Sequence, residues 1–214
     1  MRRGTTFLGL ALFASGCGSS SPGGGEDMAA QAPGCAQMVT QDGPYTGDAA
    51  GALQRTQPKV LALQPDALLV SVAGSGLDTM SGQTVGGDQS QWIVTFYSAK
   101  NGRNYAGVYS GERGVVSCQQ ALPADPLPPT APSPTQGSCA VMKAAITRLL
   151  ADAKARNIAR PMISMSNLTY GQVTIGIKPP VERSWRVDLT PWAMLVDDAT
   201  GAVKDCAYTG SPCK

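Results

Sequence analysis

The sequence predicts an α+β protein made of two tandem small domains, each with one helix packed on an antiparallel sheet. Three observations support this. Residues 139–156 carry apolar side chains along one helical stripe. Alternating strands led by tryptophan occur at 92–96 and at 185–189. A proline-rich stretch separates two segments of similar size, 35–120 and 139–214, and the second segment gives the clearer pattern.

The helix of the second segment has recognisable ends. Ser138 can cap its start, and Asn157 suits a left-handed stop. In the first segment the corresponding stretch, 48–63, is interrupted by Gly51 and Pro58, so a helix there is less secure. The apolar stripe of the second helix comprises Val141, Met142, Ala145, Ile146, Leu149, Leu150 and Ala153.

The strands follow from alternation and turn chemistry. Trp185, Val187 and Leu189 point to one face of a strand, with polar residues between them. Residues 198–201 (Asp-Ala-Thr-Gly) form a hairpin turn, because Asp can bond its own backbone and Gly accepts a positive φ. Short β-rich stretches also occur at 67–73 and 162–167.

The two segments have the pattern of an internal repeat. Both open with Cys-Ala-x-Met, at 35–38 and 139–142, and both close with a hairpin that ends in cysteine, Cys118 or Cys206. Chance similarity between two small β-rich segments is the alternative. The predicted organisation is a signal peptide at 1–16, a flexible tether at 17–34, a first repeat at 35–120, a proline-rich linker at 121–138 and a second repeat at 139–214.

The start of the chain has the layout of an export signal. Arg2 and Arg3 precede an apolar stretch, 4–15, that is too short to span a bilayer. The stretch ends in Ala14-Ser15-Gly16-Cys17, which resembles the lipobox of bacterial lipoproteins. That resemblance implies cleavage before Cys17 and lipidation of its side chain and new N-terminus. An ordinary secretory cleavage is the alternative, because the family more often has Leu at the position of Ala14.

The charge of the chain is consistent with this processing. Arg2 and Arg3 account for the whole net charge of +2, so the chain from Cys17 onward sums to zero. A neutral chain without basic clusters lacks the electrostatic footprint of a nucleic-acid binder. Attachment to a membrane is therefore expected to come from the lipid. Gly18 stands where inner-membrane lipoproteins carry a retention aspartate, which favours the outer membrane.

A second resemblance covers about 139–206. The pattern Trp185-x-Val187, the run at 194–197 (Met-Leu-Val-Asp) and the turn at 199–203 (Ala-Thr-Gly-x-Val) resemble the end of a PepSY domain. The first segment keeps Trp92-x-Val94 but lacks the turn. The resemblance implies a helix on a curved antiparallel sheet, an architecture shared with cystatin-like modules. It also implies a binding or inhibitory module for partner proteins, often peptidases, without catalytic residues of its own.

Catalytic and metal-binding patterns are scarce in the sequence. The chain has no histidine, which excludes Ser-His-Asp and Cys-His catalysis and most zinc sites. Asp197 and Asp198, with Asp188 nearby, could form a carboxylate pair, but a capped turn explains them better. Met162 and Met165 could serve as thioether ligands for copper(I), but three residues apart on a strand they face opposite sides, so they are expected to fill core space. No cofactor and no metal is predicted.

The remaining cysteines are predicted to be structural, because an envelope location favours disulfides. The repeat pairs Cys35 with Cys118 and Cys139 with Cys206, which leaves Cys213 over. A short Cys206–Cys213 loop is the alternative pairing.

The function expected from these observations is that of a membrane-anchored envelope lipoprotein that binds a partner protein, such as a peptidase, without catalysis. A structural envelope protein is the first alternative. A small-ligand carrier or a hydrolase that uses carboxylates alone is the second.

Overall fold

The computed structural model describes residues 39–85, 90–120, 131–171 and 183–214. These residues form two helices and one ten-stranded antiparallel sheet. The helices are α1 (Ala49–Leu63) and α2 (Ser138–Ala155). The strands are β1 (Val39–Asp42), β2 (Leu68–Ser75), β3 (Gln91–Ser98), β4 (Arg103–Ser110), β5 (Gly114–Gln120), β6 (Met165–Gly171), β7 (Ser184–Thr190), β8 (Trp192–Asp197), β9 (Val203–Tyr208) and β10 (Ser211–Pro212).

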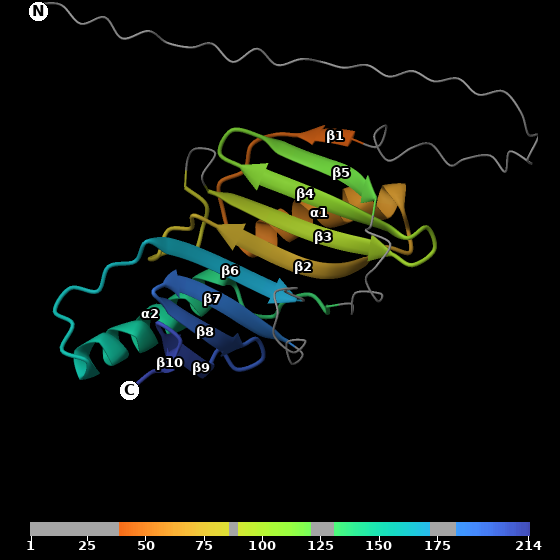
Figure 1. The fold of residues 1–214 in the computed structure, drawn as a ribbon. Coiled ribbons are helices and arrows are strands. Elements are labelled where there is room, and N and C mark those ends of the chain that lie inside the picture. The colour runs from red at the N-terminus through yellow and green to blue at the C-terminus, as the bar shows by residue number, and fades with distance from the viewer. Residues whose placement is uncertain (1–38, 86–89, 121–130, 172–182) are drawn as a thin grey trace, which may run out of the picture. The chain divides into compact units, whose positions relative to one another are not determined.

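The strand order is β1-β5-β4-β3-β2-β6-β7-β8-β9-β10 (Figure 1). Residues 39–120, here the first half, contribute one side of the sheet, and residues 131–214, the second half, contribute the other. The halves join where β2 pairs with β6, from Ser71 opposite Gly171 to Gly74 opposite Leu168. The predicted α+β class is therefore confirmed, but the two segments share one sheet.

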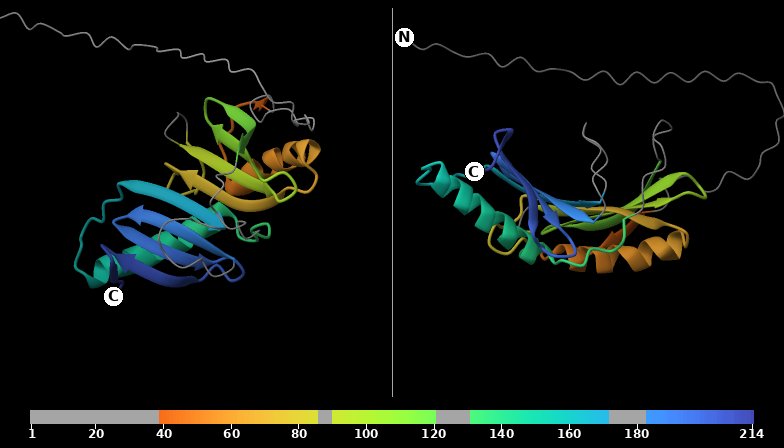
Figure 2. Two further views of the ribbon diagram at one scale, coloured as in Figure 1. Left: turned by 45° about the vertical axis from the view of Figure 1, so that its right-hand side comes forward. Right: turned by 90° about the horizontal axis from the view of Figure 1, so that it is seen from below.

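Both helices pack on the same face of this sheet (Figure 2). Helix α1 contacts β2 to β5, and helix α2 contacts β7 to β9. When the helices are aligned at their starts, Ala49 corresponds to Ser138, 89 residues later. The buried positions then coincide: Ala49, Ala52, Leu53, Thr56 and Val60 of α1 match Ser138, Val141, Met142, Ala145 and Leu149 of α2.

Helix α1 is continuous despite Gly51 and Pro58. Asp48 caps it, because its carboxylate accepts a hydrogen bond from the Gly51 N–H at 2.9 Å. Pro58 lies on the exposed side, where it loses a backbone hydrogen bond but does not disturb the contact with the sheet. The buried stripe, more than local propensity, holds this helix in place.

Helix α2 ends as predicted and begins differently. Asn157 has φ 60°, and the Ile158 N–H donates to the Ala153 carbonyl at 2.8 Å, which closes a left-handed stop. Ser138 is the first helical residue and not its cap, which is Gly137. The Ser138 hydroxyl instead accepts a hydrogen bond from the Ala49 N–H at the start of α1, at 3.3 Å.

The strands confirm the predicted alternation. Trp185, Val187 and Leu189 of β7 are fully buried, as are Trp92 and Val94 of β3. The β-rich stretch predicted at 162–167 begins later, since β6 starts at Met165. In the turn after β8, Asp197 provides the cap: its carboxylate accepts from the Thr200 N–H at 2.8 Å, and Gly201 has φ 71°.

Candidate functional site

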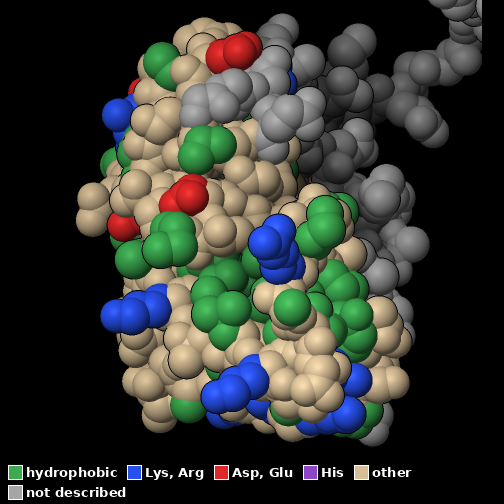
Figure 3. Space-filling view, turned by 90° about the vertical axis from the view of Figure 1, so that its left-hand side faces the viewer, with side chains coloured by type: hydrophobic (Ala, Val, Ile, Leu, Met, Phe, Trp, Pro, Cys, Tyr) green, Lys and Arg blue, Asp and Glu red, His purple; other side chains and the backbone are tan. Residues whose placement is uncertain are grey.

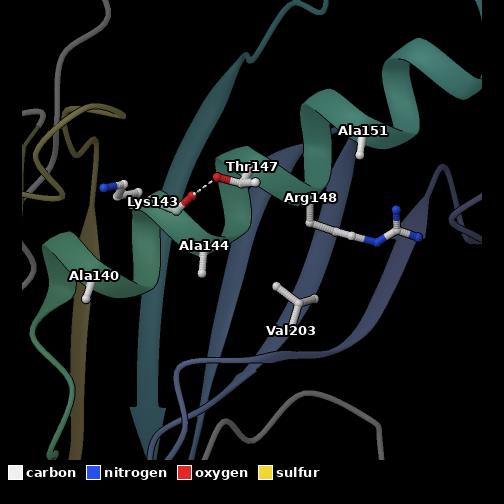
Figure 4. A pocket seen from close by; sticks show the side chains of 7 residues that line it. All are labelled: Ala140, Lys143, Ala144, Thr147, Arg148, Ala151 and Val203. Atoms are coloured by element: carbon white, nitrogen blue, oxygen red, sulfur yellow. Dashed lines mark hydrogen bonds between the residues drawn. The ribbon is translucent and has the colours of Figure 1, made fainter.

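A shallow, open groove of about 570 Å³ lies between α2 and the start of β9. Figure 4 shows its lining: the Ala144 side chain of α2 points toward Val203 of β9, and the long side chains of Lys143 and Arg148 extend to opposite sides. The residues that line it are Ala140, Lys143, Ala144, Thr147, Arg148, Ala151 and Val203.

The spacing of small residues on α2 creates the groove. Ala140, Ala144, Thr147 and Ala151 recur every three or four residues and so fall on one side of the helix. Three of them are exposed and Ala144 is half-buried, because the buried stripe of α2 lies beside them. Small side chains leave room above the helix backbone, and the groove is this space.

The other wall of the groove is an incompletely paired strand edge. β10 pairs only with Tyr208 and Ala207 of β9, and the Cys213 N–H donates to the Cys206 carbonyl at 2.9 Å. Beyond that point, no residue in the described part of the chain pairs with the outer side of 203–205. Backbone groups at such an edge are available to another strand.

The chain tail is fixed beside the groove by α2. The Asp152 carboxylate is fully buried and accepts hydrogen bonds from Trp192 Nε1 at 2.9 Å, the Lys214 N–H at 2.6 Å and Arg156 Nε at 2.8 Å. Burial opposes ionisation of Asp152, but these hydrogen bonds hold its pKa below the ordinary value. Arg148 donates to the Lys214 carbonyl at 2.9 Å, so Lys214 lies next to the groove.

The charges at the groove are basic. Lys143 and Arg148 line it, and none of its seven lining residues is acidic. Lys204, the neighbour of Val203, forms an ion pair with Asp197. That contact, with the hydrogen bonds from Thr200, lowers the pKa of Asp197 to about 2.

The cysteine pairing requires a correction. Cys206 is bonded to Cys213, with the two Cα atoms 5.4 Å apart, and Cys139 is free and exposed. The predicted Cys139–Cys206 bond is therefore absent, and the alternative pairing is present. Cys118 is disulfide-bonded, but Cys35, its predicted partner, lies outside the described residues, so that bond stays a prediction.

The reason for the error is that the repeat does not place its cysteines at equivalent positions. In β4 and β5, Gly107 lies opposite Val116 and Tyr105 opposite Cys118; in β8 and β9, Met194 lies opposite Cys206 and Trp192 opposite Tyr208. Cys118 thus corresponds to Tyr208. Cys139 lies inside α2, whereas α1 begins well after Cys35, so the shared Cys-Ala-x-Met is not structurally equivalent either.

The carboxylates considered as a catalytic pair have separate structural contacts. Asp198 is buried and accepts from Trp185 Nε1 at 2.9 Å and from the backbone of Thr135 at 2.8 Å. Asp188 forms an ion pair with Arg186 at 2.9 Å. Asp197 caps the turn.

Cys17, the predicted lipidation site, lies outside the described residues.

Two methionines predicted to fill the core are exposed. Met162 is 83% exposed and lies before β6, and Met165 is 54% exposed at the first position of β6. Figure 3, which views the molecule from the left of Figure 1, shows hydrophobic side chains gathered in the lower half of this face beside Lys and Arg. This apolar surface and the groove are both features that sequence periodicity did not indicate.

No protein family, curated protein or solved structure matches this chain. Within the described ranges, no cluster of three or more acidic, cysteine or histidine residues could hold a metal ion. The same ranges contain no helix that is long and apolar enough to cross a membrane.

Proposed function

We propose that this chain is a lipid-anchored protein of the bacterial envelope that acts by binding another protein and has no catalytic turnover. The proposal assigns the lipid to Cys17 and the outer membrane as its location. It also assigns each half of the sheet, with its helix, to a PepSY-like or cystatin-like repeat. Binding takes place at the groove between α2 and β9.

The observation that carries the proposal is the combination of an apolar groove with an unpaired strand edge. Ala144, Thr147 and Val203 give the groove an apolar or small surface, and 203–205 supply free backbone groups along its side. Burial of apolar area contributes affinity, and hydrogen bonds along a strand edge set the direction of a bound chain. A protein partner can use both at once.

The contacts of the buried carboxylates support the non-catalytic part of the proposal. Asp152 and Asp198 each accept at least three hydrogen bonds: Asp152 from an indole, a backbone N–H and the Arg156 guanidinium, and Asp198 from an indole and two backbone N–H groups. A general acid or base must be able to exchange a proton with substrate near neutral pH. These two groups are instead tied to the chain tail and to the residues that lead into α2, which gives both of them a structural task.

The proposal can be tested by photo-cross-linking in cells. A photoreactive amino acid at Ala151, in the groove, should capture one envelope protein. The matched control is Ala62, an exposed alanine at the equivalent position of α1, and it should capture none. Equal capture from both positions would contradict binding at the groove. Hydrolysis of peptidoglycan or peptides by the purified protein, lost on Asp198→Asn, would contradict the non-catalytic role.

A further inference from the structure

We infer that the groove receives an extended segment of the partner that carries an Asp or Glu side chain followed, a few residues later, by an aromatic one. This inference rests on the proposed function and specifies the ligand of the same groove. It comes from the internal repeat, because the first half shows what the equivalent groove contains.

In the first half the groove is filled by the chain itself. β1 pairs with the outer side of β5, from Val39 opposite Ser117 to Asp42 opposite Gly114. The Asp42 carboxylate lies 2.9 Å from Lys59 Nζ on α1. Burial opposes ionisation of Asp42, but this contact with Lys59 holds its pKa below the ordinary value.

An aromatic side chain completes the filling. The Tyr45 ring lies 4.9 Å from the guanidinium carbon of Arg55. It also covers Gly51, where an added Cβ would overlap the Tyr45 ring and hydroxyl. The Tyr45 hydroxyl donates to the Asp48 carbonyl at 3.1 Å. An extended segment with a carboxylate and then an aromatic ring therefore covers this side of α1.

The same helix positions line the open groove in the second half. Aligned by the helix starts, Gly51, Arg55, Lys59 and Ala62 of α1 correspond to Ala140, Ala144, Arg148 and Ala151 of α2. Arg148 thus stands where Lys59 holds the strand carboxylate. Ala144 replaces Arg55, which leaves more room for an aromatic ring on α2 than on α1.

Residues 131–137, which lead into α2, do not fill this space. The Ala131 N–H donates to the Leu69 carbonyl of β2 at 2.8 Å, and the Thr135 N–H donates to Asp198 at 2.8 Å, so these residues follow another course. β10 runs along β9 in the same direction as β1 runs along β5, but it covers only Tyr208 and Ala207. Among the described residues, none pairs with Val203 at the position equivalent to Asp42.

The chemistry of the site fits such a segment. The partner backbone would pair with the outer side of 203–205, as in strand addition. Its carboxylate would meet Arg148, whose guanidinium has five N–H donors and uses one on the Lys214 carbonyl. Its aromatic ring would lie on Ala140 and Ala144. The bound segment would repeat in trans the arrangement that β1 and Tyr45 make in cis.

The test uses a fluorescent synthetic peptide with the sequence of residues 39–48 and the full-length chain. Fluorescence anisotropy measures binding, and hydrogen exchange with mass spectrometry locates it. We expect slower exchange over 203–205. Binding should weaken at least about tenfold with Arg148→Gln or when the peptide carries Asp42→Asn, since a charge-assisted hydrogen bond is lost. Lys154→Gln, an exposed lysine of α2 outside the groove, is the matched control and should bind normally.

Three results would overturn the inference: no binding of this peptide, equal binding by Arg148→Gln and the natural chain, or slower exchange confined to 114–117, where the peptide would replace β1. The proposed function fails separately. If Ala151 still captures a partner in cells while the peptide fails, the groove binds protein but not a segment of this kind. If Ala151 captures nothing, the function itself is wrong.

Discussion

Removing the Asp152 carboxylate should destabilise the second half strongly. This side chain is fully buried and holds three donors from three parts of the chain: Trp192 of β8, Arg156 at the end of α2 and the backbone N–H of Lys214. Asp152→Ala would leave all three donors without their acceptor. Asp152→Asn keeps one acceptor oxygen and nearly the same volume, and so separates the loss of charge from the loss of shape.

The expected magnitude follows from burial. An unsatisfied buried donor costs about 1–3 kcal/mol, and breaking a buried ion pair costs about 3–5 kcal/mol. The Arg156 side chain is 17% exposed, so water can partly solvate its charge. We therefore expect Asp152→Ala to lower the free energy of unfolding by about 3–4 kcal/mol and Asp152→Asn by about 1–2 kcal/mol.

The effect should depend on pH in one direction. Because the pKa of Asp152 in the folded chain is below its ordinary value of 3.8, the ionised form stabilises the fold above that pH. This contribution is lost as the pH falls through the folded pKa. The difference in stability between the natural chain and Asp152→Asn should therefore stay constant well above pH 3.8 and shrink as the pH falls below that value.

Urea unfolding of the oxidised protein measures these changes through the midpoint, provided the slope stays constant. Glu112→Gln is the control, because Glu112 is exposed between β4 and β5 and should change stability little. A loss below about 1 kcal/mol for Asp152→Ala, or a difference that does not change with pH, would show that these hydrogen bonds do not hold the tail as described.

Three further predictions concern the anchor, the cysteines and a buried hydroxyl. Cys17→Ser should abolish labelling by a radioactive fatty acid and release the protein from its membrane fraction; persistent label would rule out lipidation at this residue. Without reductant, peptide mapping should find Cys206 linked to Cys213 while Cys139 alkylates freely, and replacing the linked pair with Ser should cost about 2.5 kcal/mol for so short a loop. Tyr170→Phe should leave stability unchanged or raise it by about 1 kcal/mol in urea unfolding, because its buried hydroxyl has no hydrogen-bond partner in the described structure, and burial raises its pKa to about 12; a clear loss would reveal a hidden partner.

Features that depend on neighbouring residues could be predicted from the sequence. The left-handed stop at Asn157 needs one residue in a special conformation, and the burial of Trp185 and Val187 needs only alternation along one strand. Helix α1 was harder to predict than α2, because Gly51 and Pro58 lower the local helix propensity. Packing of its buried stripe against the sheet stabilises this helix, and a rule based on neighbouring residues cannot include that tertiary contribution.

Features that depend on register between distant strands could not be predicted. The expected disulfide assumed that Cys118 and Cys206 were equivalent, but the strand ladders shift the match by two residues, to Val116 and Cys206. The joining of the halves through β2 and β6 is equally non-local. The groove was missed for another reason: residues 131–137, which lead into α2, take a different course from their counterparts before α1, and alanines at helix spacing do not reveal that.

The groove allows one more prediction, made at Ala144. Glu at this position lies four residues before Arg148 on the same side of α2, the favourable order for an ion pair on a helix. Ala144→Glu should therefore leave the free energy of unfolding in urea unchanged or raise it by about 0.3–0.5 kcal/mol. The new carboxylate should also form an ion pair with Arg148 and so compete with a partner's carboxylate.

A variant that folds normally and occupies Arg148 separates binding from folding. If the partner's carboxylate needs Arg148, Ala144→Glu should weaken binding of the 39–48 peptide several-fold more than Ala144→Gln does, since Gln has the same length and no charge. If the new side chain only took up space in the groove, both variants would bind the peptide equally weakly. Because α1 carries Arg55 at the equivalent position without harm to its helix, a long side chain here is compatible with the fold. Equal binding by the Glu and Gln variants would therefore show that charge at Arg148 does not select the partner.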